Sequence, residues 1–180
     1  MSTMGIIFSN IYDNNMGELT AMRTSASIPF GSRYRQVDFV LSNMANSGIK
    51  SIGIITKYNY QSLMDHLGNC EEWDLKLGDG VRFLPPYATG HTGAYHGKLE
   101  ALQTAMPVLE RSDADYVVLS DTTVLCAINF RLVVEEHVRS GCDITVIAKR
   151  SSTPRSSSAQ TARSRIWPSI TARRRITSSA

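Results

Sequence analysis

One stretch, residues 23–56, constrains the fold of this chain more than any other. Four of its apolar residues recur at steps of three and four positions, which predicts the buried face of a helix: Val37, Val40, Leu41 and Met44. Gly48 follows them and can adopt the left-handed conformation in which many helices end. Residues 51–56 are short and rich in isoleucine, which is typical of a buried strand. The stretch therefore predicts a helix followed directly by a strand.

Further apolar runs have the length and the β-branched composition of strands. They are residues 4–9, 116–120 and 143–148. Helical patterns lie between them, so the chain predicts a parallel sheet flanked by helices, an α/β fold. Ligands of such sheets bind beyond the carboxyl ends of the strands. The long loop over residues 10–31 follows such an end, and we expect it to contact a ligand.

Residues 99–109 predict a helix with one apolar face, although Pro107 lies inside it. The expected buried residues are Leu99, Leu102, Met106 and Leu109. Because an interior proline removes a hydrogen bond and clashes with the preceding turn, we expect this helix to bend or to end early. Farther along, Asn129 is positioned to cap a helix over residues 130–139, and Gly141 to end it.

The composition is typical of a globular protein. No apolar run approaches the roughly 20 residues of a membrane span, and the N-terminus has no basic-then-apolar signal pattern, so we expect a cytoplasmic protein with no membrane contact. The three cysteines are widely spaced, which suggests neither a disulfide framework nor a zinc site. Three histidines show no spacing of metal ligands, and we expect surface or capping roles for His66, His91 and His137.

The character of the chain changes at residue 150. Residues 151–180 contain six Arg and nine Ser but no acid, although the whole chain has a net charge of only +3. Few apolar residues are present to offset the entropy of ordering, so we expect residues 150–180 to be disordered. They are a solvated tail, a basic segment for an anionic partner, or a product of out-of-frame translation. We favour the last interpretation and do not expect nucleic-acid binding.

Residues 29–49 read PFGSRYRQVDFVLSNMANSGI. This block resembles the signature of ADP-glucose pyrophosphorylases (glucose-1-phosphate adenylyltransferases), the sugar nucleotidyltransferases of glycogen synthesis. Residues 5–10, GIIFSN, and 54–67, IITKYNYQSLMDHL, resemble the GlgD-type subunit more closely than the catalytic one. The resemblance extends to about residue 149 and implies a partial, Rossmann-like nucleotidyltransferase domain over residues 1–149. By this resemblance, we expect the rest of that domain and the family's left-handed β-helix domain to be missing from these 180 residues.

The loop after the first strand departs from the family pattern. Active members carry a Gly-rich loop with an Arg that can hold nucleoside triphosphate phosphates. Residues 9–18 instead read SNIYDNNMGE, with one glycine, two acids and no base. A Lys of the following motif is replaced by Ser25, whose hydroxyl cannot neutralise phosphate charge. The resemblance therefore implies degenerate catalytic motifs, with Ser25 at the degenerate position.

Other family positions are partly retained. Asp121 follows the strand over residues 116–120, where active members hold Mg²⁺, although a turn carboxylate is the plain alternative. The family's next His and second Asp are here Thr122 and Asn129. Tyr95 and Gly97 match a segment that surrounds the sugar phosphate, although His96 replaces its Arg and residues 98–100 also depart from the usual pattern. The resemblance implies Asp121 as a metal position and Tyr95 and Gly97 as substrate-binding positions.

Two functions remain open from the sequence. The favoured one is a non-catalytic or weakly catalytic regulatory subunit that forms a hetero-oligomer with a catalytic ADP-glucose pyrophosphorylase subunit. The alternative is an active glucose-1-phosphate adenylyltransferase that makes ADP-glucose from ATP and glucose 1-phosphate. Mg²⁺ is implied as cofactor if any activity remains, and a nucleotide or sugar phosphate as ligand.

Overall fold

The computed structural model describes residues 1–10, 13, 16–76, 80–85, 97–148 and the backbone of 166–173. Its central sheet has the strand order β5-β4-β1-β6-β8-β7. The strands are β1 (Thr3–Phe8), β4 (Ser51–Ile55), β5 (Val81–Leu84), β6 (Tyr116–Asp121), β7 (Ile144–Ala148) and β8 (Ile166–Arg173). Strand β1 pairs in parallel with both β4 and β6, and β4 pairs in parallel with β5. The predicted α/β class with a parallel sheet is confirmed.

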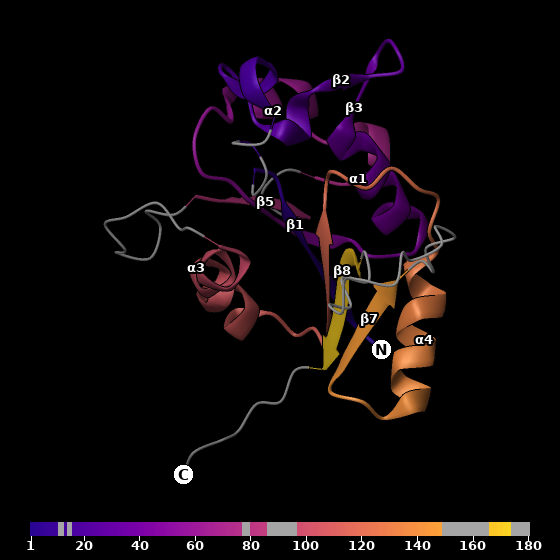
Figure 1. Ribbon diagram of the computed structural model, residues 1–180. Helices are drawn as coiled ribbons and strands as arrows, with labels where there is room; N and C mark the ends of the chain where they lie inside the picture. Colours follow the sequence, from indigo (N-terminus) through magenta and orange to yellow (C-terminus); the bar gives the residue numbers. More distant parts are fainter. Residues whose placement is uncertain (11–12, 14–15, 77–79, 86–96, 149–165, 174–180) are drawn as a thin grey trace, which may run out of the picture.

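Helices cover both faces of this sheet (Figure 1). They are α1 (Gln36–Asn46), α2 (Gln61–Leu67), α3 (Lys98–Arg111) and α4 (Phe130–Ser140). On β1, Ile7 belongs to the core shared with α1, α2 and α4, whereas Ile6 belongs to the core shared with α3. This alternation is the period-two geometry of a strand. Among the described residues, no helix combines the length and apolar character that a membrane crossing needs.

Short elements fill the segment between β1 and α1. The 3₁₀ helices η2 (Gly17–Thr20) and η3 (Ser25–Ser27) are followed by a hairpin of β2 (Pro29–Phe30) and β3 (Tyr34–Arg35). A third 3₁₀ helix, η4 (Glu71–Trp73), follows α2. The segment predicted as an unstructured loop is therefore partly folded, which fixes the position of several of its side chains.

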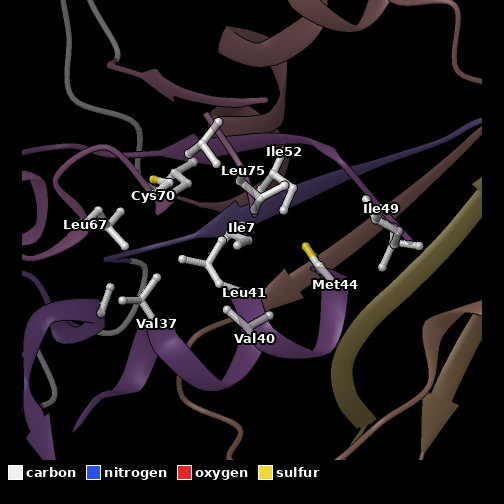
Figure 2. Close-up of a cluster of buried hydrophobic side chains, with 14 of the residues drawn as sticks. Ile7, Val37, Val40, Leu41, Met44, Ile49, Ile52, Leu67, Cys70 and Leu75 are labelled. Atoms are coloured by element: carbon white, nitrogen blue, oxygen red, sulfur yellow. The ribbon is translucent and has the colours of Figure 1, made fainter. Parts of the chain in front are cut away.

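Helix α1 packs its apolar face onto the centre of the sheet (Figure 2). The residues predicted for this face are each at most 2% exposed: Val37, Val40, Leu41 and Met44. They share a buried cluster with Ile7 of β1 and Ile52 of β4. Because burying one aliphatic side chain of this size contributes about 1.5–3 kcal/mol, this face anchors α1. Gly48, at φ 79°, has the left-handed conformation expected after the helix end.

Polar side chains of α1 hold the segment that follows β6. The Asn43 amide donates from Nδ2 to the Cys126 carbonyl at 2.7 Å and accepts on Oδ1 from the Ile128 N–H at 3.2 Å. Ser47 Oγ accepts from the Phe130 N–H, at the start of α4, at 2.8 Å. These bonds join α1 to a segment more than 80 residues later in the chain. The sequence block that predicted α1 thus also contains Asn43 and Ser47, which connect this helix to residues 126–130.

Two histidines are less exposed than the sequence suggested. His66 Nε2 lies 2.6 Å from Asp38 Oδ1, so this side chain joins α2 to α1. His137 is 1% exposed, and its Nδ1 lies 2.7 Å from Thr145 Oγ1. Its ring also packs edge-on against Tyr116. The expected surface role was wrong for His137, because β6 and β7 cover that side of α4; His91 lies outside the described residues.

The predicted apolar face of α3 was right only in part: Leu109 is buried and Leu102 packs against the core, but the other two predicted residues are exposed. Leu99 is 76% exposed and Met106 is 42% exposed. The buried residues are Ala101, Thr104, Ala105 and Leu109. Small side chains such as Ala101 and Ala105 let α3 approach the sheet closely, and the face of α3 that carries them is therefore the buried one. The helix continues through Pro107 to Arg111 rather than ending early, because packing on both sides of the proline supports it.

A strand lies within the segment predicted to be disordered. Strand β8 pairs antiparallel with β6 on one side and with β7 on the other. Its sequence, IWPSITAR, contains β-branched residues, and the backbone groups of two neighbouring strands can satisfy its hydrogen bonds. The register with β7 shifts where the chain passes Pro168, which has no N–H to donate. The expectation of disorder is therefore wrong for residues 166–173; out-of-frame translation stays a prediction.

We predict that Asn43→Ala lowers the free energy of unfolding by about 1–3 kcal/mol, because the Ile128 N–H and the Cys126 carbonyl each lose a partner. Asn46→Ala is the matched control: Asn46 is on the same helix but is exposed, so its replacement should change stability by less than about 0.5 kcal/mol. Urea unfolding of the three proteins measures both effects. Equal stability of the two variants would contradict the role assigned to Asn43.

Candidate functional site

Three parallel strands end at one edge of the sheet and gather buried polar residues there. In the register of the sheet, Phe8 at the end of β1 lies beside Ile55 of β4 and Asp121 of β6. The residues that follow these strands are buried: Ser9, Asn10, Thr56 and Thr122 are at most 4% exposed. Carboxyl ends of parallel strands are where α/β sheets bind their ligands. This edge is therefore the candidate site.

The central feature of the site is an ion pair. Asp121 is 1% exposed, and its Oδ2 lies 2.6 Å from Lys98 Nζ. Lys98 is the first residue of α3, and its side chain reaches across the ends of the strands. The ammonium also lies 5.8 Å from the centre of the Phe8 ring. Lys98 is thus held by a carboxylate from β6 and an aromatic face from β1, both of which favour a positive charge.

In the segment after β1, several of the described residues hydrogen-bond to one another. Asp13 is 3% exposed, and its Oδ1 accepts from the Ser25 N–H at 2.8 Å. The Ser25 hydroxyl donates to the Ser9 carbonyl at 3.0 Å, and the Ala26 N–H donates to the same carbonyl at 3.1 Å. A buried carboxylate thus lies in the segment in which related enzymes would hold phosphates. Like charges repel, so Asp13 opposes a triphosphate here.

Burial determines the charge balance of Asp13. Removal from water raises the pKa of this carboxyl above its ordinary value, while the hydrogen bonds from Ser25 and the charge of Lys57 act in the opposite direction. The Oδ2 atom of Asp13 is buried without a hydrogen-bond partner. The ionised form is consequently disfavoured in the folded state, and its charge is a cost that the rest of the fold offsets.

The residues predicted for the site have different roles in the structure. Asp121 lies at the end of β6, as the sequence indicated. Ser25 is 1% exposed and holds the loop to β1, so its side chain has a structural role. Gly97 precedes α3, and its carbonyl accepts from the Ala101 N–H at 2.9 Å. Tyr95 lies outside the described residues. Asp121 and Gly97 are linked through Lys98, the neighbour of Gly97.

Asn129, at the family's second acid position, is used elsewhere. Its Oδ1 accepts from the Arg131 and Leu132 N–H groups at 3.0 and 3.4 Å, which makes it the predicted cap of α4. Gly141 ends that helix at φ 66°, also as predicted. The capping role occupies the side-chain oxygen of Asn129, so the structure gives it no part in binding at Asp121.

Sequence reasoning missed two residues of this site. Lys98 was noted only as a departure from the family pattern, and Asp13 only as one of two acids in the loop. The signal for Lys98 was its position, between Gly97 and the predicted start of a helix at Leu99. Its pairing with Asp121, 23 residues later, depends on how α3 crosses the sheet, which no local pattern specifies.

The residues at this edge do not suit a divalent metal. Mg²⁺ prefers several oxygen ligands, mostly carboxylates, phosphates and water. Among the described residues, no group of three or more His, Cys, Asp or Glu side chains could hold a metal ion. The Asp121 carboxylate already has an ammonium at 2.6 Å. Asp121 thus lies at the end of β6, where a metal position was predicted, and a protein cation is paired with it.

A separate apolar groove of about 530 Å³ lies along α1. Phe30, Tyr34 and Phe39 line one part, and Leu125 and Cys126 line another. Phe30 and Phe39 meet edge to face, with ring centroids 5.6 Å apart. Its lining includes an acid, Asp38, and no base, so it does not suit a phosphate.

A parallel sheet with a polar site at the ends of β1 and β6 is typical of nucleotide-binding α/β proteins. Sequence comparison agrees with this class of protein. The chain belongs to the nucleotidyl transferase family, whose model matches residues 14–158. It is similar to the glycogen biosynthesis proteins GlgD of Bacillus subtilis (39% identity over 145 residues) and Geobacillus stearothermophilus (38% over 149 residues). The alignments cover 80% and 82% of this chain but 42% and 43% of those proteins. The predicted resemblance to GlgD-type proteins is confirmed.

Two further proteins are similar to the chain, one in sequence and one in fold. The glucose-1-phosphate adenylyltransferase of Hydrogenovibrio crunogenus is 31% identical over 147 residues, covering 80% of this chain and 34% of that enzyme. The crystal structure of a Bacillus anthracis protein assigned as a glucose-1-phosphate thymidylyltransferase has a TM-score of 0.71 at 16% identity. That alignment covers 96% of this chain and 72% of the other, and it supports the fold. The chain spans less than half the length of the curated relatives it matches.

The raised pKa of Asp13 predicts a pH dependence of stability. The folded state holds the Asp13 proton to a higher pH than the unfolded state does. The contribution of Asp13 to stability is therefore fully present below pH ~4, the ordinary pKa of Asp, and is lost as the pH rises through the folded-state pKa. Asp13→Asn keeps an oxygen acceptor for Ser25 and removes the ionisation. We expect the variant to be more stable than the wild type at pH 7, with the difference shrinking towards pH 4.

Thermal or urea unfolding at several pH values measures this difference. Asp113→Asn is the control, because Asp113 is exposed and its replacement should alter stability little at any of these pH values. A wild type that is more stable than Asp13→Asn at pH 7 would show that the ionised carboxylate is favourable. That outcome would contradict the assigned cost.

Proposed function

We propose that this chain is part of a glycogen-synthesis subunit that does not itself transfer adenylyl groups. The observation that carries the proposal lies in the segment after β1, where the Asp13 carboxylate accepts from the Ser25 N–H at the place where phosphates would have to bind. Transfer of an adenylyl group needs positive charge at the triphosphate, since the phosphates gain negative charge in the transition state. A buried carboxylate in this segment has the opposite effect.

The relatives support the glycogen-synthesis part of the proposal. The GlgD proteins at 38–39% identity are named for glycogen biosynthesis, and the enzymes at 31–33% identity are named glucose-1-phosphate adenylyltransferases. The chain is thus more similar to the GlgD proteins than to these enzymes. We propose a regulatory role in a hetero-oligomer with a catalytic ADP-glucose pyrophosphorylase subunit in the cytoplasm.

An active glucose-1-phosphate adenylyltransferase is the second candidate. The retained Asp121 at the end of β6 favours it, because a carboxylate at this place suits a nucleotide's Mg²⁺. The ion pair with Lys98 argues against this candidate function, because the Lys98 ammonium already balances the charge of the Asp121 carboxylate. A nucleotide or sugar phosphate could still bind without reaction, through residues that include Gly97 and Tyr95.

We predict no measurable pyrophosphate release when the purified chain is given ATP, glucose 1-phosphate and Mg²⁺. Loss of a charge-stabilising group commonly costs on the order of 100-fold or more in rate. Ser25→Lys alone should not restore activity, because the Asp13 carboxylate remains beside it. Turnover of about 1–100 per second, the range of phosphoryl-transfer enzymes such as kinases, would contradict the proposal and favour the second candidate.

A separate preparation tests the proposed partnership. The longer protein that contains this chain should co-elute with a catalytic ADP-glucose pyrophosphorylase subunit in size-exclusion chromatography with light scattering. It should also change the catalytic subunit's response to substrate concentration. Separate elution of the two proteins at micromolar concentration, with unchanged kinetics, would remove the partner-subunit role even if the chain is inactive alone.

A further inference from the structure

We propose that Lys98 is a built-in cation that replaces the divalent metal at Asp121 and excludes it from the site. The ammonium lies 2.6 Å from Asp121 Oδ2, which is hydrogen-bonding distance for a charged pair. A magnesium ion binds a carboxylate oxygen at about 2.0–2.1 Å. Both cations cannot approach the same oxygen from the same side, so a metal could bind there only after Lys98 had moved.

The position of Lys98 in α3 supports this role. A cation in the first turn of a helix is disfavoured, because the N-terminus of the helix carries a partial positive charge. Lys98 is the first residue of α3 and therefore needs compensation from elsewhere. The carboxylate of Asp121 and the ring of Phe8 supply it from two neighbouring strands.

The burial of Asp121 supports the other half of the proposal. At 1% exposure its carboxylate has lost most of its contact with water, which is unfavourable for an ion unless a cation accompanies it. A metal would supply that charge in an enzyme of this class. Here the Lys98 ammonium supplies a positive charge from the protein itself, at Asp121 Oδ2. The inference stands on the ion pair and does not require the partnership proposed above.

The test is the binding of Mn²⁺, a spectroscopic substitute for Mg²⁺, to the wild type and to Lys98→Met. Removing the ammonium leaves the Asp121 carboxylate buried without its cation. We expect Lys98→Met to be less stable than the wild type, and to regain thermal stability as Mn²⁺ is added. The melting temperature of the wild type should not respond, and Mn²⁺ should not broaden its amide NMR signals from residues 119–122.

Three variants make the result specific. Lys98→Arg keeps the positive charge and should behave like the wild type. Lys98→Met/Asp121→Asn removes the carboxylate as well and should show no stabilisation by Mn²⁺, which excludes binding elsewhere on the surface. Lys98→Gln serves if Lys98→Met does not fold, since it is polar and of similar length.

Each outcome of the Mn²⁺ experiments either supports or overturns the proposal. At least a tenfold tighter Mn²⁺ affinity in Lys98→Met or Lys98→Gln than in the wild type, lost in the double variant, supports the proposal. Equal broadening of residues 119–122 in the wild type and Lys98→Met would overturn it, because Lys98 would then not exclude the metal. Absence of any Mn²⁺ effect at Asp121 in both folded single variants would also overturn it, because the carboxylate would not be a metal position.

Discussion

The parallel pairing of β1 between β4 and β6 is the constraint on which the rest of this structure depends. It makes β1 the strand whose two faces contribute to both cores, with Ile7 on one side and Ile6 on the other. Gly5 lets the Met44 side chain of α1 pack directly against β1, since a Cβ at residue 5 would lie 2.5 Å from Met44 Sδ. The same pairing brings Phe8 beside Asp121, and so decides where the chain can present polar groups to a ligand.

At that edge of the sheet, the negative charge of Asp121 is balanced by a lysine of the same chain, Lys98. An enzyme that transfers a nucleotidyl group needs cations for the phosphates, from the loop after β1 and from a metal beyond β6. This chain has an acid in that loop, Asp13, and a lysine at the acid beyond β6, Asp121. Asp13 places an acidic group where active enzymes have a base, whereas Lys98 supplies a positive charge where they bind a metal ion. Both features agree with the non-catalytic role proposed above for this chain.

The sequence predicted the features that depend on local pattern. The apolar spacing over Val37–Met44 located the buried face of α1, and β-branched runs located the strands that end at the site. The face of α3 was not predictable in this way, because small residues such as Ala101 and Ala105 are buried for their fit against the sheet, whereas the larger Leu99 is exposed. The Lys98 pair and the strand β8 depend on contacts between distant segments, and no window of sequence contains both partners.

The central claim is that the cation at Asp121 belongs to the protein. A crystal structure of the chain grown with MnCl₂ and ATP, with diffraction data collected at the manganese absorption edge, tests it most directly. We predict that Lys98 Nζ remains within hydrogen-bonding distance of Asp121 Oδ2 and that no anomalous peak lies at this carboxylate. A manganese peak bonded to Asp121, with Lys98 displaced and the ATP phosphates attached to the metal, would contradict the account and identify a working nucleotidyltransferase centre.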